Sequence, residues 1–253
     1  MIALITPTGA RKDQFLLCAK WMKRQDYTGK VLWIIVDDAL PLTTNIVQPE
    51  FKENWEIIKV YPRPVWNGEN TQGRNIKAGI DALMTSEHYA EIKSIFIIED
   101  DDYYKENYLT EMTKRLGLYY LIGETNTIYY NVHWRQHCDN NNRQHASLFQ
   151  TAFTKELLPL FINCLNNKFI DFVFWNKASN KLLFQAGTLA VGIKGMPGRG
   201  GIGAGHKRTM AFLQDPNLTY LKNLIGNDDA MEYERYYSNN SQPQHGLLFT
   251  KSN

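Results

Sequence analysis

Four consecutive carboxylates, Glu99, Asp100, Asp101 and Asp102, directly follow an apolar run at residues 94–98. A short apolar run is typical of a buried strand, and a buried strand cannot continue through unpaired charges. We therefore predict a strand over residues 94–99 with the carboxylates at its carboxyl end. Crowded carboxylates repel one another, a bound cation relieves the repulsion, and oxygen ligands suit Mg²⁺ or Mn²⁺. The alternative is an acidic turn that caps a helix over residues 103–115.

Two earlier apolar segments also end in polar residues, namely Thr6, Pro7 and Thr8 after the first and Asp37 and Asp38 after the second. Hydrophobic periodicity predicts strands at 2–6, 31–36 and 55–61 and helices at 13–24 and 71–83. This alternation predicts an α/β fold with a mostly parallel central sheet flanked by helices. In such sheets, ligands bind beyond the carboxyl ends of the strands. We therefore expect the polar groups to form one site along that edge.

Composition indicates a folded chain of 253 residues, of which 43% are hydrophobic, with a net charge of +2. That charge is too small to indicate nucleic-acid binding by itself. The three cysteines form no CxxC pair, which favours a reducing compartment. No apolar run approaches the roughly 18 residues of a membrane span, and the amino terminus lacks the pattern of a signal peptide. We therefore expect a cytoplasmic protein with no membrane span.

The second half of the chain shows a different pattern. We expect strands at 118–123, 128–133, 148–153, 182–184 and 189–193, helices at 155–165, 171–178, 218–225 and 230–237, and a polar loop at 133–142. No Pro-rich or Ser-rich linker separates this part from the first. We therefore predict a single domain over residues 1–253, with halves at 1–115 and 116–253.

A glycine-rich loop at residues 195–208 is the second strongest candidate site. Closely spaced glycines let backbone N–H groups approach phosphate oxygens, and Arg199, Lys207 and Arg208 add positive charge. The loop contains a GxGxxG pattern from Gly198. We reject a dinucleotide site, because no opening βαβ unit or acidic ribose ligand accompanies the pattern. A flexible surface loop is the alternative.

The polar loop at 133–142 and the nearby His145 contain several histidines and a cysteine. Their spacing matches no structural zinc pattern. Two interpretations remain open. One is an acceptor-binding loop that uses Trp134, Arg135, Arg143 and His145, and the other is a solvated loop rich in turn-forming residues.

The ordered set of motifs in the first 110 residues resembles nucleotide-sugar glycosyltransferases of the GT-A fold, in particular the inverting family 2 type. The motifs are Thr6-Pro7-Thr8, Val36-Asp37-Asp38, the segment 73–79, and Asp100-Asp101-Asp102 as a version of the DxD motif. The carboxyl-terminal half resembles small phage-encoded glycosyltransferases more loosely. The resemblance implies a hexosyl- or pentosyltransferase, located in the host cytoplasm if it is phage-encoded.

The resemblance implies a role for each matched position. A nucleoside-diphosphate sugar, with UDP as the expected nucleotide, would be the donor. Its leaving diphosphate needs a cation, Mn²⁺ or Mg²⁺, to stabilise the developing charge. The implied metal ligands are Asp102, Asp100 and His206. The implied donor-binding residues are Thr6, Pro7, Thr8, Asp37, Asp38, Arg74, Asn75, Asp100, Asp101, Arg199 and Lys207.

An inverting transfer also needs a general base for the acceptor hydroxyl. The resemblance places it near the start of a helix after the acceptor-side strands, where Asp171 stands. The alternative is that Asp171 is a helix N-cap. The acceptor is predicted less sharply: hydroxymethylated bases in phage DNA, flipped into an aromatic-lined pocket, or else a cell-surface saccharide or a protein.

Two other functions are weighed against transfer. A sugar nucleotidyltransferase would open with a Gly-rich, Arg- and Lys-containing loop after the first strand, of which Gly9-Ala10-Arg11-Lys12 is a faint version. A non-catalytic sugar- or nucleotide-binding module would not need the full set of carboxylates together with a candidate base.

Overall fold

The computed structural model describes residues 1–40, 47, 51–140, 142–185, 187–201, 205–206 and 212–237. The core is a seven-stranded sheet in the order β10-β6-β9-β4-β1-β2-β3, in which β9 runs antiparallel to both of its neighbours and the other pairs are parallel. Its strands are β1 (Ile2–Thr8), β2 (Val31–Asp37), β3 (Trp55–Val60), β4 (Ser94–Ile97), β6 (Leu121–Glu124), β9 (Thr151–Thr154) and β10 (Lys181–Phe184).

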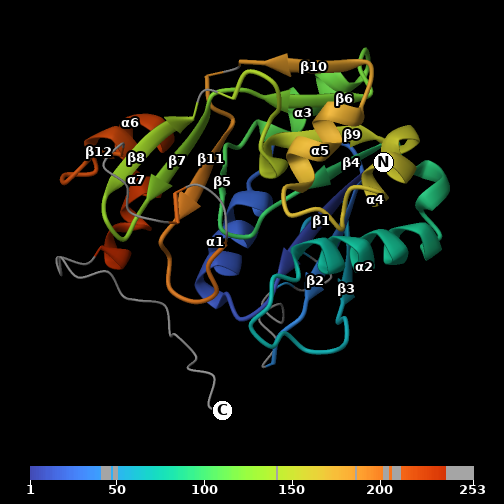
Figure 1. Ribbon diagram of the computed structural model, residues 1–253, viewed down its shortest axis with the longest axis horizontal. Helices are drawn as coiled ribbons and strands as arrows, with labels where there is room; N and C mark the ends of the chain where they lie inside the picture. Colours follow the sequence, from blue (N-terminus) through green and yellow to red (C-terminus); the bar gives the residue numbers. More distant parts are fainter. Residues whose placement is uncertain are drawn as a thin grey trace.

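Helices cover both faces of this sheet, which confirms the predicted mixed α/β architecture (Figure 1). Successive residues of a strand point to opposite faces. On β1, Ala3 and Ile5 join a cluster that contains α2 (Gln72–Thr85), α4 (Leu158–Ile162) and α5 (Ile170–Lys177). Ile2 and Leu4 join the other cluster, with α1 (Lys12–Lys23), α3 (Tyr108–Leu116), α6 (Thr219–Ile225) and α7 (Asn227–Met231).

A second sheet of five strands has the order β12-β8-β7-β11-β5. Its strands are β5 (Tyr103–Tyr104), β7 (Thr127–Asn131), β8 (Gln136–Asn140), β11 (Ala190–Lys194) and β12 (Leu213–Gln214). Figure 1 shows this sheet beside α6 and α7, on the opposite side of the molecule from β2 and β3. Its strand β5 follows directly after the acidic run, so β11 is brought close to those carboxylates.

The carboxyl ends of the parallel strands are level with one another. Thr8 is the register partner of Asp37, and Ile5 is the partner of Ile97. Strand β4 is shorter than predicted, because its regular pairing ends at Ile97. The backbone then turns, and the Glu99 N–H donates to the Tyr104 hydroxyl at 2.9 Å instead of to a neighbouring strand.

Several local predictions are wrong. The first half of the helix expected at 103–115 is β5 and a turn, since Tyr103 and Tyr104 pair with β11. The loop expected at 133–142 contains β8, which the polarity of its residues concealed. The helices expected at 155–165 and 230–237 are the shorter α4 and α7, each with a 3₁₀ turn beside it, and residues 148–150 form a 3₁₀ turn before β9.

Candidate functional site

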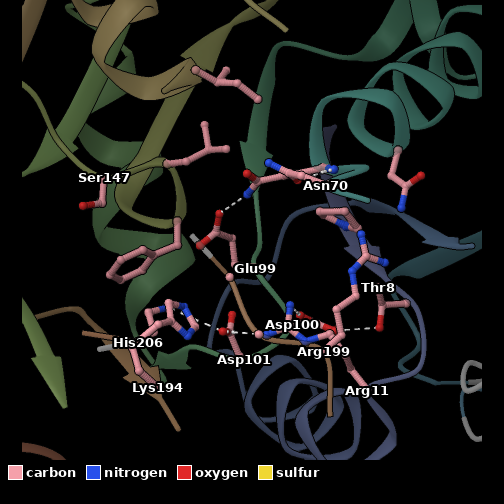
Figure 2. A pocket seen from close by; sticks show the side chains of 18 of the residues that line it. Thr8, Arg11, Asn70, Glu99, Asp100, Asp101, Ser147, Lys194, Arg199 and His206 are labelled. Carbon is pink, nitrogen blue, oxygen red and sulfur yellow. Dashed lines mark hydrogen bonds and ion pairs between the residues drawn. The ribbon is translucent and has the colours of Figure 1, made fainter. Parts of the chain in front are cut away.

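A cavity of about 500 Å³ lies where the strand ends meet the second half of the chain (Figure 2). Segments far apart in the chain contribute to its wall. They are the end of β1 with Arg11, the segment before and within α2, the acidic run after β4, Tyr129 of β7, residues 147–149, the beginning of α5, Lys194 at the end of β11, and the glycine-rich segment. The lining residues include Pro7, Thr8, Arg11, Trp66, Asn75, Glu99, Asp100, Asp101, Phe169, Asp171, Lys194, Arg199 and His206.

Three of the four carboxylates of the acidic run line the cavity, and the fourth does not. Glu99, Asp100 and Asp101 line the cavity, whereas Asp102 lies behind them with a fully buried side chain. The Thr8 hydroxyl donates to Asp100 Oδ2 at 2.6 Å, so the end of β1 holds the first aspartate of the run in place. The predicted convergence of the β1 and β4 ends is therefore present in the fold.

Two basic side chains neutralise part of the acidic run, and sequence reasoning assigned neither to it. Arg11 contacts Asp100 at 2.9 Å and Asp101 at 2.6 Å. Lys194, at the end of β11, contacts Asp102 at 2.9 Å and Asp101 at 3.5 Å. The available signal was a lysine that ends an apolar run just before the glycine-rich loop. Such a buried lysine requires a charged partner.

The charge balance of this group leaves an excess of negative charge. Four carboxylates and two cations sum to a formal −2 when all are ionised. Burial raises the pKa of Asp100 to about 6 and also raises the pKa of Glu99 and Asp102, since a buried carboxylate is favoured in its neutral form. At Asp101 burial acts in the same direction, but the attraction of Arg11 and Lys194 outweighs it and lowers the pKa.

Three carboxylates of the run meet the geometry of a cation site. Glu99, Asp101 and Asp102 each offer an oxygen, and these oxygens lie within 4.8 Å of one another. Asp102 Oδ2 is buried and has no hydrogen-bond partner among the described residues. The oxygen donors and the excess negative charge fit a hard divalent cation. Burial and the nearby Lys194 lower the pKa of His206 to about 4, so its imidazole is neutral at pH 7 as metal ligation requires.

Asp38 is the centre of a second polar group, beneath the other side of the cavity. Its carboxylate accepts from Arg74 and Arg199 at 2.9 Å each, from Asn75 at 2.7 Å and from the Thr71 hydroxyl. Asp38 is 1% exposed, so it acts by holding the residues around it. Because Arg74, Asn75 and Thr71 come from α2 or its N-cap, this carboxylate fixes the start of α2 to the end of β2.

The other predicted donor-binding positions are partly in the cavity wall. Pro7, Thr8 and Asn75 line the cavity. Thr6 is buried and its hydroxyl accepts from the Trp33 indole at 2.8 Å, whereas the buried Asp37 accepts from the Ala39 N–H at 3.2 Å. These two lie beside the lining residues. The donor-binding roles assigned to this set remain predictions.

The glycine-rich segment is fastened to the first half of the chain. Arg199 contacts Asp38 and the Thr71 hydroxyl, and its guanidinium lies 4.7 Å from the Trp66 ring. The Gln14 amide donates to the Pro197 carbonyl at 2.7 Å. Arg199 therefore closes one side of the cavity. Lys207, Arg208 and Gly203, the last glycine of the GxGxxG pattern, lie outside the described residues.

Asp171 lies in the first turn of α5 and lines the cavity. The N-cap of this helix is Phe169, and no side chain caps it, so the N-cap alternative for Asp171 is wrong. Burial raises the pKa of Asp171, and its Oδ1 accepts from the Phe172 N–H at 2.8 Å. A half-buried carboxylate with a raised pKa at a cavity wall is suited to general-base chemistry.

The histidines between residues 133 and 145 do not gather into a metal site in the described part of the chain. His137 stacks on Tyr220 at 3.5 Å, and His145 meets Phe172 edge-on at 5.5 Å. In the described residues, no helix combines the length and apolar character that crossing a membrane requires.

No protein-family model matches the chain, and no curated protein matches its sequence. Its fold matches a crystal structure of S. aureus TarS with a TM-score of 0.56 and 12% identity, over 76% of this chain and 36% of that one. TarS 1–349 in complex with UDP matches with a TM-score of 0.57 and 11% identity, over 76% of this chain and 60% of that one. TarS 1–349 in complex with UDP-GlcNAc matches with a TM-score of 0.54 and 12% identity, over 76% of this chain and 58% of that one. The chain thus spans less than two thirds of each matched structure, and at this identity the likeness establishes a mixed α/β fold of the GT-A-like class.

Proposed function

We propose that this chain is a glycosyltransferase that moves a sugar from a nucleoside-diphosphate sugar, with UDP as the nucleotide, to an acceptor hydroxyl. One observation carries the proposal. The polar ends of β1 and β4 and the candidate base Asp171 line one cavity, at the strand edge where α/β sheets bind ligands. Solved structures with the same fold contain UDP and UDP-GlcNAc, which supports the choice of donor.

The donor would lie along the β1 edge of the cavity. Pro7, Thr8 and Asn75 face the space that the base and ribose would take, and Asp38 holds the start of α2 there. The diphosphate would lie near Lys194 and Arg199, since both cations line the cavity. Charge-assisted hydrogen bonds from such groups bind phosphate strongly.

Glu99, Asp101 and Asp102 would hold Mn²⁺ or Mg²⁺, since their oxygens cluster. His206, a predicted ligand, does not belong to this cluster, but it lines the same cavity and would be a further ligand from that side. When bound, the cation would stabilise the negative charge that develops on the leaving diphosphate. This set of ligands differs from the one expected from the sequence, which contained Asp100 and Asp102 of the acidic run. Asp100 does not belong to the group of clustered oxygens, whereas Asp101 belongs to it and lines the cavity, so Asp101 is the better-placed ligand on the cavity side.

Asp171 would act as the general base of an inverting transfer. It would take the proton of the acceptor hydroxyl as that oxygen bonds to the anomeric carbon. The bond from that carbon to the diphosphate would break on the opposite side, and the nucleoside diphosphate would leave. Burial raises the pKa of Asp171, which improves the strength of this carboxylate as a base.

The acceptor would enter beside α5, where Phe169 and Phe172 are 55% and 45% exposed. Such rings can stack on a sugar or on a flipped base. Hydroxymethylated DNA, a saccharide and a protein all remain candidate acceptors. Arg135, one basis of the DNA hypothesis, donates to the Pro216 carbonyl and packs on Tyr237, so it is engaged within the fold.

A panel of nucleotide sugars, with and without Mn²⁺, tests the proposal. Release of nucleoside diphosphate supports transfer. Release of pyrophosphate from a nucleoside triphosphate and a sugar phosphate would instead support a nucleotidyltransferase. Binding of UDP-GlcNAc by calorimetry without any turnover would support a binding module, and no binding of any nucleotide sugar would overturn the proposal. Salt-sensitive retention on duplex DNA would favour a DNA acceptor.

A further inference from the structure

Lys194 occupies an unusual position for a lysine. It ends β11, it is 6% exposed, and its ammonium lies between two carboxylates, 2.9 Å from Asp102 Oδ1 and 3.5 Å from Asp101 Oδ2. The rings of Tyr129 and Phe149 lie 5.8 Å from the ammonium. Figure 2 shows Lys194 beside Asp101, and Lys194 also lines the cavity. The ammonium therefore stands at the boundary between the acidic run and the ligand space.

The Lys194 contacts overlap the candidate cation site. Two of the three residues that offer clustered oxygens, Asp101 and Asp102, are the two that Lys194 contacts. Asp102 is held in place from the backbone as well, because the Ile193 N–H donates to its Oδ1 at 2.9 Å. Its other oxygen, Oδ2, is buried and has no hydrogen-bond partner among the described residues. An unpartnered buried oxygen points to a missing cation or donor.

A divalent cation and the ammonium cannot share these oxygens. Both need the same lone pairs, and two like charges a few ångströms apart inside a protein repel strongly. Arg11 contacts Asp100 at 2.9 Å and Asp101 Oδ2 at 2.6 Å, whereas the Asp102 carboxylate is contacted by Lys194. Arg11 can therefore stay on Asp100 and on this one oxygen of Asp101 while the cation replaces Lys194. Lys194 has a flexible four-carbon chain, and the cavity in front of it offers the released ammonium a place to go.

We propose that Lys194 is a resident counter-ion of the acidic run, which a divalent cation displaces from Asp101 and Asp102. The displaced ammonium turns into the cavity, where it becomes a binding group for an anionic ligand such as a diphosphate. After the exchange, two cationic groups, the metal ion and the released Lys194 ammonium, can face an anionic ligand in the cavity. The exchange of cations does not depend on the proposed transfer reaction, whereas the diphosphate step rests on it.

Mn²⁺ alone, titrated by electron paramagnetic resonance, tests the exchange in the absence of any donor. The variants are Lys194→Met, Lys194→Arg, and the control Lys177→Met, which removes an exposed lysine from α5. We expect Lys194→Met to bind Mn²⁺ at least tenfold more tightly than the wild type, and Lys177→Met to match the wild type. Lys194→Arg keeps a positive charge and should gain no affinity. Equal or weaker Mn²⁺ binding by Lys194→Met, or no binding by any variant, would overturn the proposal.

Two further measurements are made, one for the case that the variant folds poorly and one for the second step of the proposal. If Lys194→Met is poorly folded without metal, its melting temperature with and without Mn²⁺ still reports the exchange, and Mn²⁺ should raise it more than in the wild type. Inorganic pyrophosphate, titrated at saturating Mn²⁺, reports the released ammonium. It should bind about tenfold more weakly to Lys194→Met than to the wild type, and unchanged binding refutes the second step. Neither the Mn²⁺ titration nor the pyrophosphate titration uses a nucleotide sugar. Both results can therefore be interpreted even if the transfer assay of the proposed function fails.

Discussion

Replacing Arg11 with methionine should lower the free energy of unfolding more than replacing an exposed charged residue does. The guanidinium contacts Asp100 at 2.9 Å and Asp101 at 2.6 Å, and these side chains are 1% and 8% exposed. Removing one partner of a buried ion pair costs about 3–5 kcal/mol, because the remaining charge is uncompensated. Solvent reaches 16% of the Arg11 side chain, so we expect the lower end, about 3 kcal/mol. For a chain of this size, that is a fall of roughly 6–12 °C in melting temperature.

The pH dependence of this loss follows from the carboxylates. Arg11 contributes to the lowered pKa of Asp101, so its stabilisation is fully present above the unfolded pKa of about 3.9 and is lost only as the pH falls below that value, towards the lower pKa of the folded state. The pKa of Asp100 is about 6 even with Arg11 present, so in the variant this group is ionised at a higher cost above pH 6. The difference between Arg11→Met and the wild type should therefore be largest at pH 8 and shrink towards pH 4.

Urea denaturation followed by circular dichroism at pH 8 and pH 5 measures the effect. Lys12→Met is the matched control, because Lys12 is exposed and directly follows Arg11. It should change the free energy of unfolding by less than about 0.5 kcal/mol. The reasoning fails if Arg11→Met behaves like Lys12→Met at pH 8, or if its deficit grows on acidification.

Three other changes test the rest of the site and the packing behind it. Asp171→Asn should reduce transfer at least 10³-fold, within the roughly 10²–10⁴-fold contribution of a general base, and leave UDP affinity within about twofold; unchanged turnover removes the assignment. In the wild type, the acidic limb of the pH–rate profile should lie above the ordinary Asp value of 3.8, since burial raises the pKa of this base; a limb at or below that value contradicts it. Arg199→Met should weaken UDP binding by roughly tenfold, or about 1.4 kcal/mol, through the loss of charge-assisted bonds; calorimetry that finds equal affinity argues against Arg199 as a donor contact. Gly79→Val should destabilise the fold by about 1–3 kcal/mol, because even its Cβ would stand 2.7 Å from Ile5 Cγ2. Gly117→Ala, whose Cβ meets only the Lys114 carbonyl at 3.8 Å, is the urea-melt control, and equal stability of the two variants would contradict the packing argument.

The first four strands and two helices could be read from the chain because their apolar patterns are local. Residues 31–36 are continuously apolar, as buried parallel strands are, and β2 is buried throughout. Strand β8 could not be read in this way. Gln136 and His137 are polar, yet both are buried by pairing with β7 and by the stack of His137 on Tyr220. Its strand character comes from these distant partners.

What the sequence determined by itself is the edge at which the site lies. Strand order is not needed for that inference, since parallel strands that each end in polar residues must present them on the same side of the sheet. The tertiary structure alone decided which cations meet the acidic run and which carboxylates reach the cavity. Lys194 is 92 positions from Asp102 and arrives there because β11 pairs with β5, directly after the run. Burial of charge demands a partner, but only the packing of the two sheets selects it.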